Sequence, residues 1–248
     1  MIDLHTHLLP GIDDGPDTLA QSLALCRIAV AAGTTHAVAT PHIHPERWNN
    51  TREIIRRACG ELRAQLVQQG IPLQLGFAAE VRLSEQIIEQ LMRDEIPFYG
   101  EVDGFRIMLL EFPHGHIIPG SDKLVRWLLA RNIRPLIAHP ERNKQVMRDP
   151  DSLLPFLEAG CWLQVTAGSV IGSFGERAEA VAHQLLAEGK VAVVASDGHN
   201  DGPRQPALRL AFDAICLRYS EETARSLMWH TPAAITAGQF AAMEDTTQ

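Results

Sequence analysis

Short apolar runs recur along the chain and alternate with segments in which apolar residues have helical spacing. Seven of these runs are aliphatic and most are nearly continuous in apolar character, as strands covered on both faces are. Strands that alternate with helices form parallel sheets, because each helix returns the chain to the start of the next strand. The expected strands span residues 2–5, 36–40, 73–79, 105–111, 134–138, 162–166 and 191–196.

Helices are expected between the strands, over residues 18–32, 52–69, 84–93, 121–131 and 174–188. Glycines at 33, 70 and 189 follow three of them as stop signals. The segment after Arg204 predicts two or three more helices, at about 206–219, 221–228 and 232–239. No repeat, low-complexity segment or linker interrupts the chain. We therefore predict one domain over residues 1–248, in which residues from about 205 to 248 form a helical tail packed on the rest.

Histidines and carboxylates occur at the ends of the expected strands or in the loops that follow them. A barrel gathers the carboxyl ends of its strands at one mouth, so a closed or distorted α/β barrel fits this placement best. A doubly wound open sheet is the alternative. The candidate metal ligands are His5, His7, Asp14, His42, Glu80, Glu111, His139, Asp197 and His199. Nine such residues exceed what one ion needs, which points to a multinuclear metal hydrolase.

Two of the nine positions have a rival close by in the sequence. In the loop after Gly11, Asp14 could instead cap a turn or the following helix, a role that Asp13 or Asp17 could serve equally well. His44 competes with His42 for the role of ligand. These alternatives stay open on the residues alone.

Other positions show stronger local signals for a metal site. His5 and His7 stand two apart on an extended segment, so both side chains lie on one face. Asp197 and His199 repeat that spacing after the last strand. Glu80 ends a strongly apolar run, and so does Glu111; a carboxylate there is costly unless a metal ion or an arginine neutralises it.

Composition narrows the function further. The chain has 248 residues, a hydrophobic fraction of 46% and a net charge of −8 without any Lys/Arg run, which is typical of a soluble globular protein and argues against a nucleic-acid-binding surface. A ligand-bearing strand starts at residue 2, and no apolar stretch is long enough for a bilayer, so we expect no signal peptide, no membrane insertion and a cytoplasmic location.

The four cysteines are widely spaced and form no C-x-x-C pair, so we expect reduced, mostly buried thiols. A cysteine-dependent tyrosine phosphatase carries an arginine six residues after its nucleophile. The positions six residues after the four cysteines hold Ala32, Gln65, Ala167 and Glu222. That class of phosphatase is therefore excluded.

The order of the motifs resembles the PHP (polymerase and histidinol phosphatase) superfamily. It runs H-x-H, D-D-G, T-P-H, two strand-end glutamates, H-P-E-R and S-D-x-H, and it covers essentially residues 1–205. The most specific piece is the opening H-x-H-x-L-P-G-x-D-D-G over residues 5–15. It is similar to the bacterial manganese-dependent protein-tyrosine phosphatase branch, which is associated with capsule and exopolysaccharide synthesis.

The resemblance implies a distorted (β/α)7 barrel with three divalent metal ions held by the nine residues named above. Manganese is the expected metal, with Fe, Zn, Co or Mg as alternatives, and Glu80 is expected to bridge two ions. The resemblance also makes Arg142 and Arg204 candidates for binding the phosphate, since a guanidinium group can hold two oxygens at once. The alternative for each is a surface arginine paired with Glu141 or Asp201.

The same resemblance suggests a phosphotyrosine protein as the partner, namely an autophosphorylated bacterial tyrosine kinase with a flexible tail. A PHP phosphatase acting on a small phosphomonoester such as histidinol phosphate is the first alternative, although the D-D-G opening disfavours it. A non-catalytic module that only binds phosphotyrosine is the second. A metal-dependent amidohydrolase is more remote. By position, the barrel mouth could be lined by Trp48, Phe112, His114 and His116.

Overall fold

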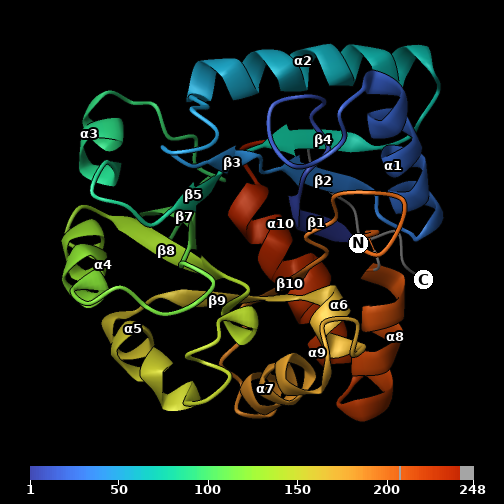
Figure 1. Cartoon of the computed structure of the whole chain (residues 1–248). Coiled ribbons are helices and arrows are strands. Elements are labelled where there is room, and N and C mark those ends of the chain that lie inside the picture. Colours follow the sequence, from blue (N-terminus) through green and yellow to red (C-terminus); the bar gives the residue numbers. More distant parts are fainter. Residues whose placement is uncertain (207, 241–248) are drawn as a thin grey trace.

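Parallel strands close into a barrel in the computed structural model, which describes residues 1–206 and 208–240 (Figure 1). One ladder runs β1-β2-β4, and the other runs β10-β9-β8-β7-β5-β3. β3 and β5 continue β2 and β4 after short interruptions, and β3 pairs with β5 just as β2 pairs with β4. Backbone bonds close the ring between its last and first strands. Asp197 N–H donates to the carbonyl of His5 at 2.7 Å, and His7 N–H donates to Gly198 at 2.8 Å.

The strands lie close to their expected positions. Most of the helices surround the ring of strands on its outside (Figure 1). Three differences concern the strands: the runs at 36–40 and 73–79 each lead into a second short strand, and β6 pairs antiparallel with β7. The strands are β1 (Ile2–Thr6), β2 (His36–Ala39), β3 (His42–Ile43), β4 (Gln74–Phe77), β5 (Glu80–Arg82), β6 (Glu101–Val102), β7 (Phe105–Glu111), β8 (Ile133–Ala138), β9 (Trp162–Thr166) and β10 (Val193–Ala195).

Two of the helices begin at threonine caps. Thr18 caps α1 with a reciprocal capping box, and Thr51 caps α2 through a side-chain bond to Ile54 N–H. The expected helix at 84–93 begins only at Ile87. The helices are α1 (Leu19–Ala31), α2 (Arg52–Gln68), α3 (Ile87–Met92), α4 (Ser121–Leu129), α5 (Leu154–Ala159), α6 (Ala167–Val170), α7 (Glu176–Ala187), α8 (Leu208–Arg218), α9 (Glu221–Arg225) and α10 (Thr231–Thr236), with 3-10 turns at Pro140–Arg142 and Pro150–Leu153 and a π-helical turn at Ser226–His230.

The interior of the barrel is filled by apolar side chains that stand two residues apart on the strands. The residues between them, such as Val81, Met108 and Ile137, face outward into a second cluster shared with the helices. This gives the two layers expected of a barrel wrapped in helices. The strand residues of the interior cluster are Ile2, Leu4, Val38, Ile107, Leu109, Leu136, Ala138, Val193 and Ala195, and Ala78 joins them from the interruption between β4 and β5.

The C-terminal helices close the end of the barrel at which the strands begin. Trp229 and Ile235 belong to the interior cluster, and Figure 1 shows α10 in the centre of the ring of strands. The Gln239 side chain donates to the carbonyls of Phe77 and Tyr99 at 3.0 and 2.7 Å. These contacts give the described part of the expected helical tail a packing role; residues 207 and 241–248 of that tail lie outside the described residues.

Two further expectations concern the cysteines and the membrane. All four cysteines are free; Cys26, Cys59 and Cys161 are buried, while Cys216 is half-buried. Burial raises the pKa of the Cys26 thiol to about 12, so that group is a neutral core side chain at physiological pH. Across residues 1–206 and 208–240, no helix combines the length and apolarity that crossing a bilayer requires.

Candidate metal centre

Side-chain alternation carries the proposed ligands to the mouth of the barrel. Ala78, Leu109 and Ala195 are interior residues of β4–β5, β7 and β10. Two residues further along the chain, the next inward position holds Glu80, Glu111 and Asp197, respectively. Each strand thus presents apolar side chains to the interior first and a carboxylate at its carboxyl end. His42 follows the interior residue Val38 by four positions, so on an extended backbone its side chain lies on the same, inward side.

Local backbone features bring the remaining histidines into the cluster. The register between β1 and β2 shifts between Asp3 and Thr6, which lets both Leu4 and the adjacent His5 reach the inside of the barrel. His139 has φ of +32° and Asp197 has φ of +51°, a region that non-glycine residues rarely occupy. Such backbone conformations concentrate at functional sites, where the surrounding structure holds them in place.

Glu80 lies at the centre of the cluster and is almost fully buried. Its Oε2 is 3.2 Å from His5 Nε2, 3.3 Å from His7 Nε2 and 3.1 Å from His42 Nδ1. Its other oxygen, Oε1, lies 2.7 Å from His139 Nε2. A carboxylate that contacts four imidazoles with both of its oxygens is well placed to be shared between neighbouring cations.

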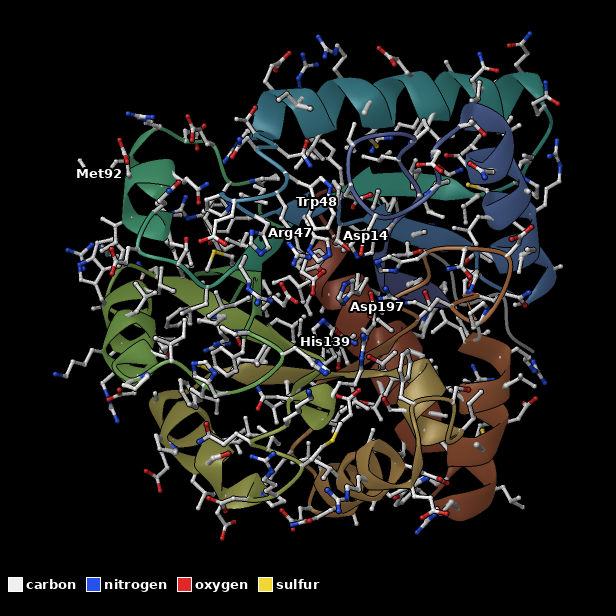
Figure 2. All side chains as sticks on the ribbon, in the orientation of Figure 1. Asp14, Arg47, Trp48, Met92, His139 and Asp197 are labelled. Atoms are coloured by element: carbon white, nitrogen blue, oxygen red, sulfur yellow. The ribbon has the colours of Figure 1, made fainter. Side chains whose placement is uncertain are left out.

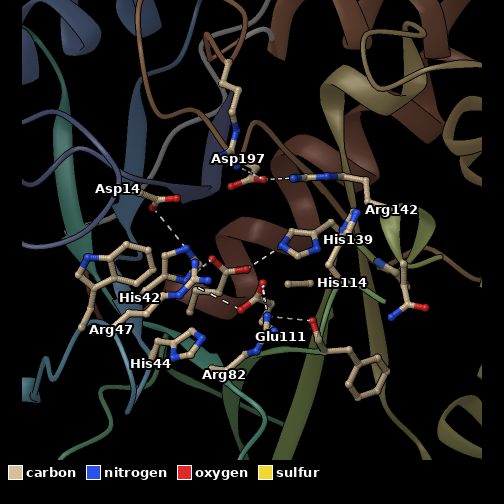
Figure 3. A pocket seen from close by; sticks show the side chains of 17 residues that line it. Asp14, His42, His44, Arg47, Arg82, Glu111, His114, His139, Arg142 and Asp197 are labelled. Atoms are coloured by element: carbon tan, nitrogen blue, oxygen red, sulfur yellow. Dashed lines mark hydrogen bonds and ion pairs between the residues drawn. The ribbon is translucent and has the colours of Figure 1, made fainter. Parts of the chain in front are cut away.

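Asp14 and Asp197 contact further histidines of the cluster. Asp14 Oδ1 lies 3.4 Å from His42 Nε2 (Figure 3). The same oxygen lies 3.2 Å from His199 Nε2. Asp197 Oδ1 lies 3.3 Å from His5 Nε2. The structure therefore brings all nine expected ligand residues together, from seven different strands or loops.

The donor atoms fit divalent metal ions. His42 Nδ1, Glu111 Oε2, Asp197 Oδ1 and His199 Nε2 are buried and, although a charged neighbour lies 3.1–4.0 Å from each, none of them makes a hydrogen bond among the described residues. Buried polar atoms are normally paired, so four unpaired ones converging on one place call for a cation. Three overlapping groups have donor atoms within 4.8 Å of one another: His5, His7, Glu80 and Asp197; His7, Asp14, His42 and His199; and His42, Glu80 and Glu111.

Charges within the cluster are balanced by neighbouring groups. Burial alone would lower the pKa of His5, but the carboxylates of Glu80 and Asp197 raise it to about 9. Burial would likewise lower the pKa of His7, and Asp13 together with Glu80 raises it to about 9. Without a metal ion, protons on these imidazoles offset the negative charge of the carboxylates. A divalent cation that binds here would displace those protons and supply the positive charge itself.

Asp13 and Gln164 orient His7 and His5 respectively, and neither was expected from the sequence to do so. Asp13 Oδ2 lies 2.6 Å from His7 Nδ1, and the Asp13 side chain is only 1% exposed. Gln164 Oε1 lies 2.8 Å from His5 Nδ1. Both contacts engage Nδ1 and leave Nε2 aimed at the carboxylates, as outer partners of metal-binding histidines do. A polar Gln164 inside the apolar run Leu163–Val165 is the signal that could have revealed it.

Both candidate phosphate-binding arginines contact Asp197. Arg142 donates through Nη1, and Arg204 donates through Nη2 at 2.7 Å, to the same Oδ2 atom (Figure 3). The Arg142 guanidinium also lies 4.3 Å above the ring of Phe174. The alternative pairing of Arg142 with Glu141 is not seen, because Glu141 is buried and accepts bonds from Thr166 N–H and Ser169 Oγ.

A cavity of about 300 Å3 opens over the cluster. Figure 2 shows Arg47 and Trp48 beside Asp14 at this mouth, with His139 and Asp197 on its other side. The rival His44 lines the cavity but belongs to none of the donor groups, and Asp17 is exposed. Of the four expected mouth residues, Trp48, Phe112 and His114 line the cavity and His116 does not.

Comparison with known proteins places this site in a family. The family model described as capsular polysaccharide synthesis, CpsB/CapC, matches residues 1–237. Tyrosine-protein phosphatase YwqE of Bacillus subtilis is 32% identical over 200 residues, which are 81% of this chain and 78% of that protein. Tyrosine-protein phosphatase CpsB of Streptococcus pneumoniae is 28% identical over 245 residues, which are 97% of this chain and 100% of that protein.

Solved structures support the same placement. A structure from work on YwqE of Bacillus subtilis and CpsB of Streptococcus pneumoniae, described as unique metal-dependent tyrosine phosphatases, superposes with a TM-score of 0.88 at 29% identity. It covers 98% of this chain and 96% of the other. An organophosphorus hydrolase from Deinococcus radiodurans has a TM-score of 0.57 at 14% identity, with 95% and 92% covered, and shares the barrel fold alone. The expected barrel and the expected family are thus confirmed, and the chain belongs to the CpsB/CapC family.

Proposed function

We propose that this chain is a metal-dependent phosphatase that hydrolyses phosphotyrosine in proteins. The observation that carries the proposal is the convergence of nine histidine and carboxylate side chains, with four orphaned buried donor atoms, beneath a cavity flanked by two arginines. YwqE and CpsB, whose names describe them as tyrosine-protein phosphatases, supply the substrate class.

The proposed cofactor is a set of three divalent ions, with Mn2+ as the expected metal. Three overlapping donor groups support this number, and Glu80 is shared by two of them. His7 belongs with His5 and Asp197, because its Nε2 faces Glu80 and Asp197 while Asp13 occupies its Nδ1. The outer group is then Asp14, His42 and His199, and the remaining group contains Glu80 and Glu111, with His139 in contact with Glu80.

The ions would supply Lewis acidity to the phosphoryl oxygens and activate water as a nucleophile near neutral pH. The chain itself supplies the orientation. Arg142 and Arg204 stand at the edge of the cavity and share one carboxylate oxygen, so each guanidinium has further N–H groups available for phosphate oxygens. We assign both arginines to binding the phosphate and stabilising its charge as the ester bond breaks.

The physiological partner we propose is a bacterial tyrosine kinase of capsule or exopolysaccharide synthesis, acting in the cytoplasm. Membership in a capsular polysaccharide family supports this partner. A phosphotyrosine on a flexible tail would also be able to enter a cavity of about 300 Å3, which is too small for a folded domain.

The test compares hydrolysis of a phosphotyrosine peptide, the matched phosphoserine peptide and histidinol phosphate, each with Mn2+ and again with EDTA. We expect hydrolysis of the phosphotyrosine peptide to dominate and to disappear with the chelator. Faster hydrolysis of histidinol phosphate would reassign the substrate to a small phosphomonoester. Tight binding of phosphotyrosine without turnover would identify a binding module, and activity that survives chelation would reject the metal site.

A further inference from the structure

The cavity above the ligand cluster is walled almost entirely by charged and polar side chains. Four of its lining residues are apolar: Trp48, Phe112, Ala138 and Pro140. The last three are buried, so among the apolar lining residues Trp48 alone is partly exposed. Phe112 is 4% exposed and packs on Phe156 with ring centres 5.0 Å apart, which leaves little of it for a ligand. Among the described residues that line this cavity, the indole of Trp48 is therefore the only sizeable apolar surface offered to an incoming molecule.

The loop that carries Trp48 is held in place at both ends. His44 N–H donates to the carbonyl of Trp48 at 3.0 Å, and Trp48 N–H donates back to His44 at 2.8 Å. Just beyond, the buried side chain of Asn50 donates to the carbonyls of His42 and Ile12 at 2.8 and 2.9 Å. These bonds tie the loop to β3 and to the loop that bears Asp14, so the indole has a defined position over the site.

The indole lies directly beside a proposed metal ligand. Its ring is parallel to that of His42, with an interplanar angle of 9° and ring centres 5.0 Å apart. His44 meets it edge-on, at 82° and 6.1 Å. Trp48 lines the same cavity as the arginines and the ligand cluster, so a phosphate held there has its ester substituent in a space that the indole borders.

From this geometry we infer that Trp48 determines specificity, by packing against the phenyl ring of an aryl phosphate. The inference rests on the proposed function and names the reason why an aryl ester is favoured. Aromatic rings attract one another in offset or edge-to-face arrangements, and the contact also removes apolar area from water. A short alkyl ester such as phosphoserine has no ring to make this contact.

The test uses two non-hydrolysable inhibitors, phenylphosphonate and methylphosphonate, on the metal-loaded full chain. They differ in the group that would meet the indole, and neither has a leaving group, so binding is separated from chemistry. We expect wild type to bind phenylphosphonate about tenfold more tightly, which corresponds to about 1.4 kcal/mol. Trp48→Ala should abolish most of this ratio, and Trp48→Phe should retain most of it.

A matched control is Trp127→Ala, which removes an indole on α4 that lies under Arg131 and away from the cavity lining. It should leave the ratio unchanged. Trp48→Ala could also loosen His42 and lower the metal content, which would be measured directly. The ratio stays informative in that case, because both inhibition constants come from the same metal-loaded fraction.

An unchanged ratio in Trp48→Ala would overturn the inference while leaving the phosphatase function intact. If wild type proves unable to hydrolyse phosphotyrosine, the proposed function fails, and the two phosphonate affinities measured by calorimetry still decide the role of Trp48. A loss of the ratio in Trp127→Ala as well as in Trp48→Ala would also contradict the inference, because the effect would then not be local to the cavity.

Discussion

Replacing Asp13 by alanine tests whether the cluster is built to hold metal ions. Asp13 Oδ2 lies 2.6 Å from His7 Nδ1, and the same atom accepts from His42 N–H at 3.2 Å. Its Oδ1 accepts from Gly15 N–H at 3.0 Å. One buried carboxylate therefore sets the ring orientation of His7, the position of His42 and the shape of the loop that carries Asp14.

The size of the effect follows from these contacts. A hydrogen bond to a charged group contributes about 1.5–3 kcal/mol, and losing an outer partner of a metal-bound histidine typically costs about 10–100-fold in metal affinity. We expect Asp13→Ala to raise the Mn2+ concentration for half-maximal phosphatase activity by that factor. Activity at saturating Mn2+ should recover much more than activity at limiting Mn2+. The assay is a Mn2+ titration of chelator-stripped protein.

Asp17→Ala provides the matched control, since Asp17 is exposed and Thr18 rather than Asp17 caps the following helix. It should leave the titration midpoint unchanged. Equal midpoints for wild type and Asp13→Ala would refute the assignment of Asp13 as the partner of a metal-bound His7.

Three further outcomes are expected. Gln164→Leu should raise the Mn2+ midpoint less than Asp13→Ala does, because it removes a neutral acceptor worth about 0.5–1.5 kcal/mol; a larger effect than that of Asp13→Ala would contradict this order. His5 and His7 have folded-state pKa values of about 9, above the ordinary value of 6.5. In the metal-free chain, these two histidines should therefore add to the free energy of unfolding in full below pH 6.5. That stabilisation, up to about 3 kcal/mol per histidine, should be lost as the pH rises through 9. Urea denaturation across this range would show it, and a metal-free chain that gains stability from pH 6.5 to 9 would not fit. Trp229→Ala should lower the free energy of unfolding by about 3–5 kcal/mol, because Trp229 closes the interior of the barrel; a loss below 1 kcal/mol in urea denaturation would argue against that role.

Much of this architecture could be predicted from the strands themselves. A strand covered on both faces shows as a continuous apolar run, and the polar residue that follows it is placed at the mouth by the parallel topology. Glu80 and Glu111 were therefore predictable as members of one site, and the structure brings them together there. The separation of β4 from β5 was not predictable, because Ala78 and Ala79 continue the apolar run through the interruption.

Several features of the site depend on the folded backbone and leave no signal in the sequence. Asp13 and Asp14 are adjacent, and only the folded loop shows that one contacts His7 while the other faces His42 and His199. The positive φ of His139 also has no sequence signature, since it depends on how β8 meets the 3-10 turn that follows. The pairing of Arg142 with Asp197 joins segments 55 residues apart, and Arg204, seven residues after Asp197, reaches the same oxygen only through the fold of its loop.

The most direct test of the central claim is a stoichiometric titration of Mn2+ into chelator-stripped protein while hydrolysis of a phosphotyrosine peptide is followed. The account predicts no activity in the stripped protein and a rise to a plateau at three equivalents of bound Mn2+. Full activity in the absence of metal would contradict it, and so would a plateau at one equivalent.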